Sequence, residues 1–267
     1  MGNPQGSFIW YELLTSDLAA ARSFYQDVMG WNIAERGSDL SDMDYRMIDA
    51  PDATVGGAME ITAEMREGGA RPTWLGYICV EDVDAVLAAI VADGGTVWMP
   101  ANSIPNVGRI ALVTDPQGAP FYIMKPIPPA DSPPDATSTA FDPEKTGHVA
   151  WNELTAADHQ AVLPFYTRHF GWQPCGAMSM GEMGNYQFIK HADVRIGAMM
   201  DRPKNGPPPH WSYYWRVDDI DAATKRATAG GATILHGPAE VPGGDYITLA
   251  TDPQGAIFAM VGKQLEA

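Results

Sequence analysis

Two glutamates, Glu12 and Glu153, occupy the same place in two similar apolar segments, IWYEL and AWNEL. Both segments are typical of β-strands, whose side chains alternate between two faces. A carboxylate on an inward face is costly to bury unless it is paired, hydrogen-bonded or protonated. The two glutamates therefore suit a general acid or base with a raised pKa, or an anchor for a ligand hydroxyl or amine. A structural carboxylate satisfied by backbone amides, a tyrosine or an arginine is the alternative.

A nearby cation would favour the structural alternative in the second half of the chain. Arg216 lies on the strand expected to face Glu153, and it is a plausible partner for that carboxylate. The residue that matches Arg216 in the first half is Cys79. We therefore expect Glu12 to be the less neutralised of the two acids.

The histidines are the other side chains that could bind a metal or move a proton, and all of them lie in the second half. His148 and His210 stand close to the starts of two expected strands. With a shifted strand register, these two histidines and Glu153 would form a three-ligand metal site. Otherwise both histidines cap strand ends or lie in solvent.

Composition limits the class of partner. The chain has 267 residues and a formal net charge of −16, which disfavours nucleic acid and anionic membrane surfaces. Its two cysteines, Cys79 and Cys175, form no CxxC pair, so neither a thiolate zinc site nor a disulfide framework is indicated. The N-terminal segment has no apolar signal sequence and no run spans a bilayer, so we expect a cytoplasmic protein that binds a small molecule.

The secondary-structure elements that position these residues occur twice along the sequence. The Phe24-Tyr25 and Gly30-Trp31 pairs recur 141 residues later, and the segment TDPQGA occurs twice letter for letter. So many ordered matches indicate a tandem duplication. A proline-rich segment over 126–146 is typical of an extended linker. We therefore predict module one over 5–125, this linker, and module two over 147–264.

Each module is predicted to contain two βαβββ units. In the first unit, an apolar strand over 8–14 precedes a helix that Asp17 caps and Gly30 ends, and three short strands follow. In the second, Asp82 caps a helix between strands, and the DPQG turn joins the last two strands. The predicted fold class is α+β, with the paired βαβββ units of each module forming a curved mixed sheet cup.

These motifs resemble the vicinal oxygen chelate superfamily, which includes glyoxalases, bleomycin-resistance proteins and ring-cleaving dioxygenases. The similarity is greatest to tandem two-module members described as glyoxalase-like or hydroxylase-like. It covers nearly the whole chain outside the linker. The residues that carry it are Asp17-Leu18, Phe24-Tyr25, Gly30-Trp31 and Asp115-Pro116-Gln117-Gly118, with Phe165-Tyr166, Gly171-Trp172 and Asp252-Pro253-Gln254-Gly255 in module two.

The resemblance also implies four inward positions per module that hold a divalent metal in many members. In this sequence those positions are Trp10, Leu75, Tyr122 and Met59 or Glu60, and then Trp151, Ser212, Ala259 and Met199 or Met200. Most of these side chains cannot ligate a divalent ion, which needs oxygen or imidazole donors. We therefore predict no metal and no other cofactor.

Inward-facing side chains, Met59 and Met199 among them, are expected to form a mostly apolar ligand site instead. The predicted ligand-binding residues are Trp10, Tyr77, Tyr122, Trp151, Tyr214 and Arg216, and the predicted catalytic residues are Glu12 and Glu153. The expected ligand is a small, partly aromatic or carbonyl-containing metabolite, with lyase-like or oxidoreductase-like chemistry if the protein turns it over. A metal-dependent glyoxalase-type lyase or ring-cleaving dioxygenase, and a drug-sequestering resistance protein, are the alternatives. Two modules in one chain allow a monomeric pseudo-dimer or a homodimer.

Overall fold

The four longer helices of the described chain each begin at an aspartate whose side chain accepts a backbone N–H. The computed structural model describes residues 2–37, 44–128, 132–133 and 135–265. Asp17 and Asp82 cap helices as the sequence predicted, and Gly30, with φ of 71°, ends the first helix in the left-handed region. The helices are α1 (Leu18–Met29), α3 (Val83–Ala92), α4 (His159–Phe170) and α5 (Ile220–Ala229). No helix among the described residues is long and apolar enough to cross a membrane.

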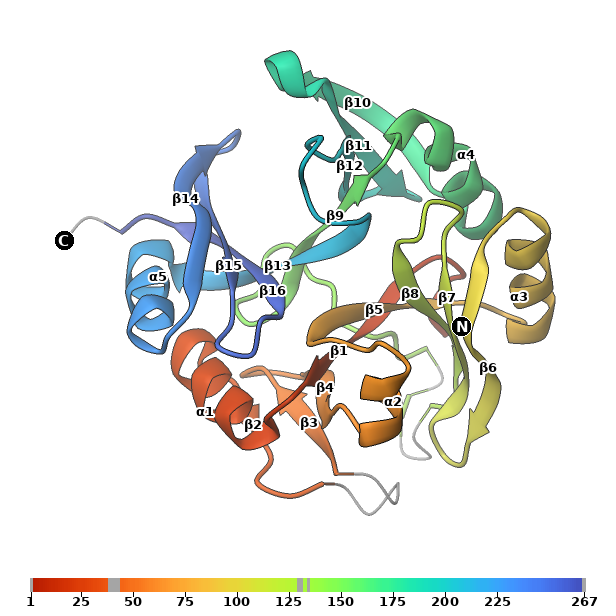
Figure 1. Cartoon of the computed structure of the whole chain (residues 1–267), viewed down its shortest axis with the longest axis horizontal. Helices are drawn as coiled ribbons and strands as arrows, with labels where there is room; N and C mark the ends of the chain where they lie inside the picture. The colour runs from red at the N-terminus through yellow and green to blue at the C-terminus, as the bar shows by residue number, and fades with distance from the viewer. Residues whose placement is uncertain (1, 38–43, 129–131, 134, 266–267) are drawn as a thin grey trace. The chain divides into compact units, whose positions relative to one another are not determined.

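The strands form two eight-stranded mixed sheets, one for each module (Figure 1). The first sheet has the order β2-β3-β4-β1-β5-β8-β7-β6, and the second has the matching order β10-β11-β12-β9-β13-β16-β15-β14. The first contains β1 (Phe8–Thr15), β2 (Asn32–Ile33), β3 (Tyr45–Asp49), β4 (Thr54–Glu60), β5 (Thr73–Cys79), β6 (Thr96–Ile104), β7 (Gly108–Thr114) and β8 (Pro120–Pro126). The second contains β9 (Val149–Ala156), β10 (Gln173–Ser179), β11 (Asn185–His191), β12 (Val194–Asp201), β13 (His210–Asp219), β14 (Thr233–Val241), β15 (Asp245–Thr251) and β16 (Ile257–Lys263).

This element order confirms the predicted α+β class and the repeated βαβββ plan. Two short elements were not predicted, the helix α2 (Ala63–Glu67) and the 3₁₀ turn η1 (Gly181–Met183). Within each first βαβββ unit, the first and last strands pair in parallel: Glu12 lies beside Gly57, and Glu153 lies beside Ala198. Outer strands pair in antiparallel fashion.

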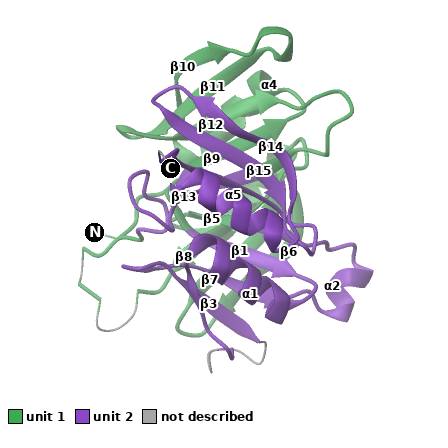
Figure 2. Cartoon of the chain, turned by 90° about the vertical axis from the view of Figure 1, so that its left-hand side faces the viewer, with its two compact units in different colours: residues 1–9, 76–138, 151–211 green, residues 10–75, 139–150, 212–267 purple. Residues whose placement is uncertain are grey.

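Contacts divide the chain into two compact units that do not coincide with the modules (Figure 2). Unit 1 holds residues 1–9, 76–138 and 151–211, and unit 2 holds 10–75, 139–150 and 212–267. Each unit therefore combines most of one half of module one with most of the opposite half of module two.

The core of unit 2 shows why the halves of different modules stay together. Tyr25 on α1 donates its hydroxyl proton to Asp252 of the second DPQG turn, at 2.9 Å. Trp74 donates its indole N–H to the same tyrosine oxygen at 3.0 Å, and Trp31 donates to the carbonyl of Gly147 at 2.9 Å. The motif residues of module one thus satisfy polar groups of module two.

Unit 1 has the same arrangement, but here the motif tyrosine and tryptophan belong to module two and the turn aspartate belongs to module one. Tyr166 on α4 donates to Asp115 of the first DPQG turn at 3.0 Å, and Trp211 donates to Tyr166 at 3.3 Å. Trp172 donates to the carbonyl of Gly6 at 2.8 Å. The tyrosine of the FY pair, the tryptophan of the GW pair and the aspartate of the DPQG turn therefore have structural roles.

The two turn aspartates are buried and well supplied with donors. Oδ1 of Asp115 accepts from the backbone N–H groups of Gln117 and Ala119, and Asp252 does the same in the second turn. Burial raises the pKa of both carboxyls, and the backbone donors oppose that rise. These acids hold the turns closed.

Candidate functional site

In unit 1, a tryptophan, a tyrosine and a glutamate form a hydrogen-bonded relay. Trp151 donates its indole N–H to Oη of Tyr186 at 2.8 Å, and Tyr186 donates its hydroxyl proton to Oε2 of Glu153 at 2.6 Å. Trp151 and Glu153 lie two residues apart on β9, so they share one face of the strand. The 2.6 Å separation is typical of a hydroxyl that donates to an ionised carboxylate. The relay fixes both the carboxylate and the indole on this face.

Tyr186 matches Tyr45 at the 141-residue offset of the repeats, which indicates a strand residue but no role in a site. Its partners Trp151 and Glu153 lie on a different strand, and no spacing in the sequence predicts the contact. In unit 2, the equivalent Tyr45 on β3 accepts the indole N–H of Trp10 at 2.7 Å. Glu12 lies two residues after Trp10 on the same face of β1, and its side chain is buried, with 3% of the residue exposed. Both modules thus bring to the predicted tryptophan a tyrosine that was not among the predicted site residues.

A glycine shapes the module-one version of this face. Gly57 on β4 lies beside Glu12, and a Cβ atom built on it would come within 2.2 Å of Oη of Tyr45. The tyrosine ring therefore lies across the bare backbone of β4. In unit 1 the residue beside Glu153 is Ala198, so a methyl group stands where module one has a glycine. The two faces carry the same polar groups on differently shaped surfaces.

The strand register corrects one residue of the expected inward set. Met59 lies beside Leu14, which shares the face of Glu12, as predicted. Met199 lies beside Leu154, whose side chain points to the opposite face from Glu153. Met200 follows by one residue and takes the inward direction. The matching segments Gly57-Ala58-Met59 and Gly197-Ala198-Met199 had suggested Met199, because the two modules differ in length by one residue before them.

The remaining predicted ligand-binding residues lie on the second βαβββ units. Tyr77 and Tyr122 pair across β5 and β8 in unit 1, with ring centroids 4.2 Å apart and ring planes at 15°. In unit 2, Tyr214 pairs with Ala259, so an alanine replaces the second ring. Their part in ligand binding remains a prediction.

Arg216 has partners other than the one expected for it. Its guanidinium forms an ion pair with Asp245 at 3.0 Å, and its Nε–H donates to the carbonyl of Pro143 at 2.5 Å. Asp245 therefore neutralises its charge. Glu153 accepts its hydrogen bond from Tyr186, and a ligand-binding role for Arg216 remains a prediction.

The side chains present do not fit a divalent cation. Trp10 and Trp151 use their only polar atom as a hydrogen-bond donor, so neither can act as a ligand. The alternative set is not assembled either. The ring nitrogens of His148 lie 2.5 Å from the Thr139 carbonyl and 2.7 Å from Asp52, and Nδ1 of His210 lies 2.9 Å from the Pro208 carbonyl. Among the described residues, no group of three or more His, Cys, Asp or Glu side chains could hold a metal ion.

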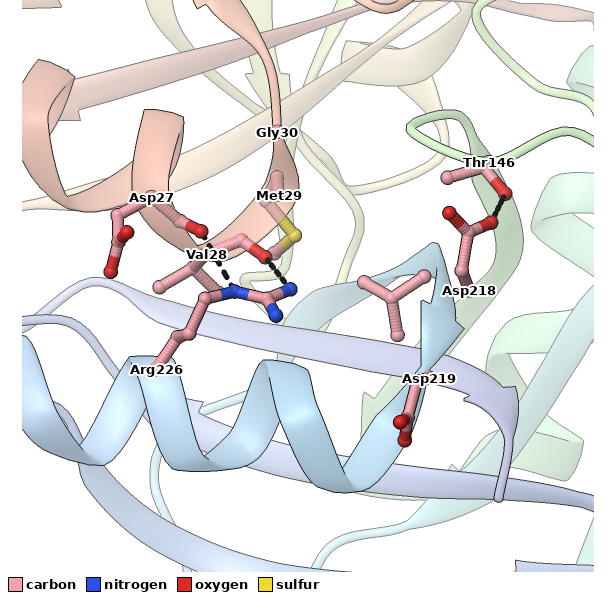
Figure 3. Close-up of a pocket in the computed structure, with 9 residues that line it drawn as sticks. Asp27, Val28, Met29, Gly30, Thr146, Asp218, Asp219 and Arg226 are labelled. Carbon is pink, nitrogen blue, oxygen red and sulfur yellow. Dashed lines mark hydrogen bonds between the residues drawn. The ribbon is translucent and has the colours of Figure 1, made fainter. Parts of the chain in front are cut away.

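A pocket of about 270 Å³ in unit 2 has none of the predicted site residues in its lining (Figure 3). It lies between the end of α1 and the start of α5, and Asp27, Asp218 and Asp219 contribute to its lining. Arg226 donates to the backbone carbonyls of Asp27 and Val28 at 2.9 and 3.0 Å. The Arg226 guanidinium in this pocket is therefore already used to satisfy carbonyl groups at the end of α1.

The family model for the Glyoxalase/Bleomycin resistance protein/Dioxygenase superfamily matches residues 7–123 and 145–260. The candidate glyoxylase CFP32 of Mycobacterium tuberculosis is 35% identical over 96% of this chain and 95% of its own length. The anthracycline biosynthesis protein DnrV of Streptomyces peucetius is 26% identical over 96% of this chain and 93% of its own length.

Solved structures show the same fold at low identity. The Mn(II)-bound glyoxalase of Novosphingobium aromaticivorans gives a TM-score of 0.63 at 17% identity, over 99% of this chain and 84% of that one. The 2,3-dioxygenase LapB of Pseudomonas sp. KL28 gives 0.61 at 14% identity, over 98% and 95%. The family match over most of the chain and the 35% identity to the mycobacterial relative show that the chain belongs to the Glyoxalase/Bleomycin resistance protein/Dioxygenase superfamily.

Proposed function

We propose that this protein binds a small, ring-containing or carbonyl-containing metabolite on the sheet faces that carry the two Trp–Tyr pairs and their glutamates, without a divalent metal. The observation that carries the proposal is the relay of Trp151, Tyr186 and Glu153, whose Trp–Tyr contact recurs in module one. Each face offers a flat indole for a ring and a carboxylate for a hydroxyl or an acidic C–H group.

The chemistry that suits this arrangement is proton transfer next to a carbonyl group, as in a lyase. The carboxylate of Glu153 would accept the proton, and the C–H electron pair would pass to the carbonyl oxygen of the ligand as an enolate. The Tyr186 hydroxyl would hold the carboxylate in place while its protonation state changes. Glu12 would have the same role on the module-one face. A relative named for anthracycline biosynthesis supports a ring-containing ligand.

Binding and metal content test this proposal together. We would purify the chain without an affinity tag and titrate it with 2-acetylnaphthalene, a neutral aromatic ketone, by isothermal calorimetry. We expect binding that a chelator leaves unchanged and that Glu153→Gln weakens, whereas the exposed Glu182→Gln serves as the matched control.

Three outcomes would change the assignment. Stoichiometric manganese, iron, nickel or zinc in the purified protein, with binding lost on chelation, would support a metal-dependent lyase or dioxygenase. Absence of binding would contradict the proposed ligand class. Tight binding without exchange of the ketone's α-protons for deuterium would favour sequestration over catalysis.

A further inference from the structure

Two cations oppose each other on the module-two face. Lys190 on β11 and Arg195 on β12 are direct cross-strand partners. Like charges in this position destabilise a sheet. Such a pair is unexpected, because the chain has thirty-three acidic residues and only seventeen basic ones. An acidic residue could have stood opposite either cation.

Neither cation has an acidic partner among the residues that the structure describes. Within the described chain, no ion pair or hydrogen bond involves the side chain of Lys190 or Arg195. The guanidinium carbon of Arg195 instead lies 4.6 Å from the centroid of the Phe188 ring. This cation–π contact orients the group and leaves its N–H donors available.

The cations share a face with the relay. Tyr186, Phe188 and Lys190 alternate along β11, so their side chains point the same way. The Phe188 ring makes edge contacts with Tyr186, at 5.7 Å between centroids, and with Trp151, at 6.0 Å. Lys190 and Tyr186 are four residues apart, about 13 Å along an extended strand. Phe188 therefore lies between Lys190 and Tyr186 along β11, in the same row as Ala198 and Glu153 on the neighbouring strands.

Module one has no such pair. At the offset that relates Tyr45 to Tyr186, Lys190 corresponds to Asp49 (190 − 141 = 49) and Phe188 to Met47 (188 − 141 = 47). Asp49 lies opposite Thr54, whose hydroxyl donates to the Asp49 carboxylate at 2.6 Å. The two faces therefore differ in charge as well as in shape.

We propose that Lys190 and Arg195 bind the anionic group of a ring-containing ligand, either a carboxylate or a phosphate, whose ring packs against Phe188 and Trp151. This inference rests on the proposed function and assigns the anionic ligand to module two. Two unpaired cations side by side supply charge-assisted hydrogen bonds to an anion, and an incoming anion removes their mutual repulsion. The module-one face lacks these cations and does not prefer an anion.

Matched aromatic probes test the anion site. We would measure the binding of 2-naphthoate, 2-naphthyl phosphate and the neutral 2-naphthamide to the full chain by calorimetry. The test variant is Lys190→Gln/Arg195→Gln, and the control is Lys204→Gln/Lys225→Gln, which removes the same charge at exposed positions. We expect at least about a tenfold loss of affinity for one or both anionic probes in the test variant only. Affinity for 2-naphthamide should stay unchanged.

The probes separate the failure of this inference from the failure of the proposed function. Unchanged binding of both anions in the test variant, or an equal loss for the amide, would overturn the anion site. If the unaltered chain binds 2-acetylnaphthalene but neither anion, the anion site is wrong and the proposed function stands. If it binds none of the four probes, both are wrong. Loss of binding to one anion alone identifies which anion the site accepts.

Discussion

The hydroxyl group of Tyr25 lies 2.9 Å from Oδ2 of Asp252, so two residues 227 positions apart share a buried hydrogen bond. Tyr166 and Asp115 form the same bond with the modules exchanged. These four residues belong to motifs that carry the family resemblance. Their contacts give those motifs a shared physical role, since each tyrosine satisfies the carboxylate of the other module.

Replacing Tyr25 with phenylalanine should destabilise the protein by about 1–3 kcal/mol, because it leaves buried polar atoms of Asp252 and Trp74 without this partner. Chemical denaturation followed by far-UV circular dichroism would measure the change. Tyr246→Phe is the control, since no described hydrogen bond involves the Tyr246 side chain. Equal unfolding midpoints for the two variants would contradict the assigned role.

Asp52 should contribute stability that disappears in acid. Lys145 and His148 lie 2.7 Å from its carboxyl oxygens and lower its pKa from 3.8 to about 2. Because the folded pKa lies below the ordinary value, the contribution is present above pH 3.8 and is lost as pH falls towards 2. Asp52→Asn should therefore flatten the dependence of unfolding free energy on pH in that window. The exposed Asp135→Asn should leave the slope unchanged.

Tyr186→Phe should weaken the binding of 2-acetylnaphthalene by about tenfold, because Glu153 loses its hydrogen-bond donor and Trp151 its acceptor. Calorimetry would measure the affinity, and tryptophan emission would report the released indole. Tyr213→Phe removes a hydroxyl from a ring outside this relay and gives a comparison for general packing effects. Wild-type affinity in the Tyr186 variant would remove the relay from the ligand site.

Gly57→Ala should cost about 1–3 kcal/mol of stability, because its methyl group would meet the Tyr45 hydroxyl at 2.2 Å and displace the ring. The opposite change at the equivalent position, Ala198→Gly, introduces no new side-chain atom and should cost only about 0.5–1 kcal/mol. Thermal unfolding would compare the two. A Gly57 variant as stable as the unaltered chain would show that Tyr45 can move without penalty.

Lys190→Gln should stabilise the protein by about 0.2–1 kcal/mol, because it removes one of two like charges that lie opposite each other. Lys204→Gln, at an exposed position, should not. Denaturation at low ionic strength would show the difference most clearly, since salt screens the repulsion. A decrease in stability would mean that Lys190 has a favourable partner.

Local signals predicted most of the fold. Asp17 and Gly30 marked both ends of α1 because capping depends on neighbouring residues alone. The duplicated motifs predicted the βαβββ order of the elements along the chain. The Tyr25–Asp252 contact could not be predicted, since periodicity carries no information about a partner so distant in the chain.

The candidate site was predictable in part. Strand alternation placed Trp151 and Glu153 on one face, and the hydrogen bonds through Tyr186 agree with that placement. The inward methionine was misassigned to Met199 because a difference of one residue reverses the face of a strand. The cation pair was overlooked because pairing across a hairpin depends on register, which a shift at Ile189 alters here.

Each compact unit combines halves of both repeats, and this arrangement bears on how the chain arose from a single repeat. A lone repeat would hold Tyr25 and Asp115 but neither Asp252 nor Tyr166. Tyr25 and Asp115 would then both lack their hydrogen-bond partners. Two separate copies would restore every bond by trading halves, as in domain swapping. Fusing the copies makes that encounter intramolecular, at an effective concentration on the order of millimolar. The proline-rich segment is then a tether that replaces an association between molecules.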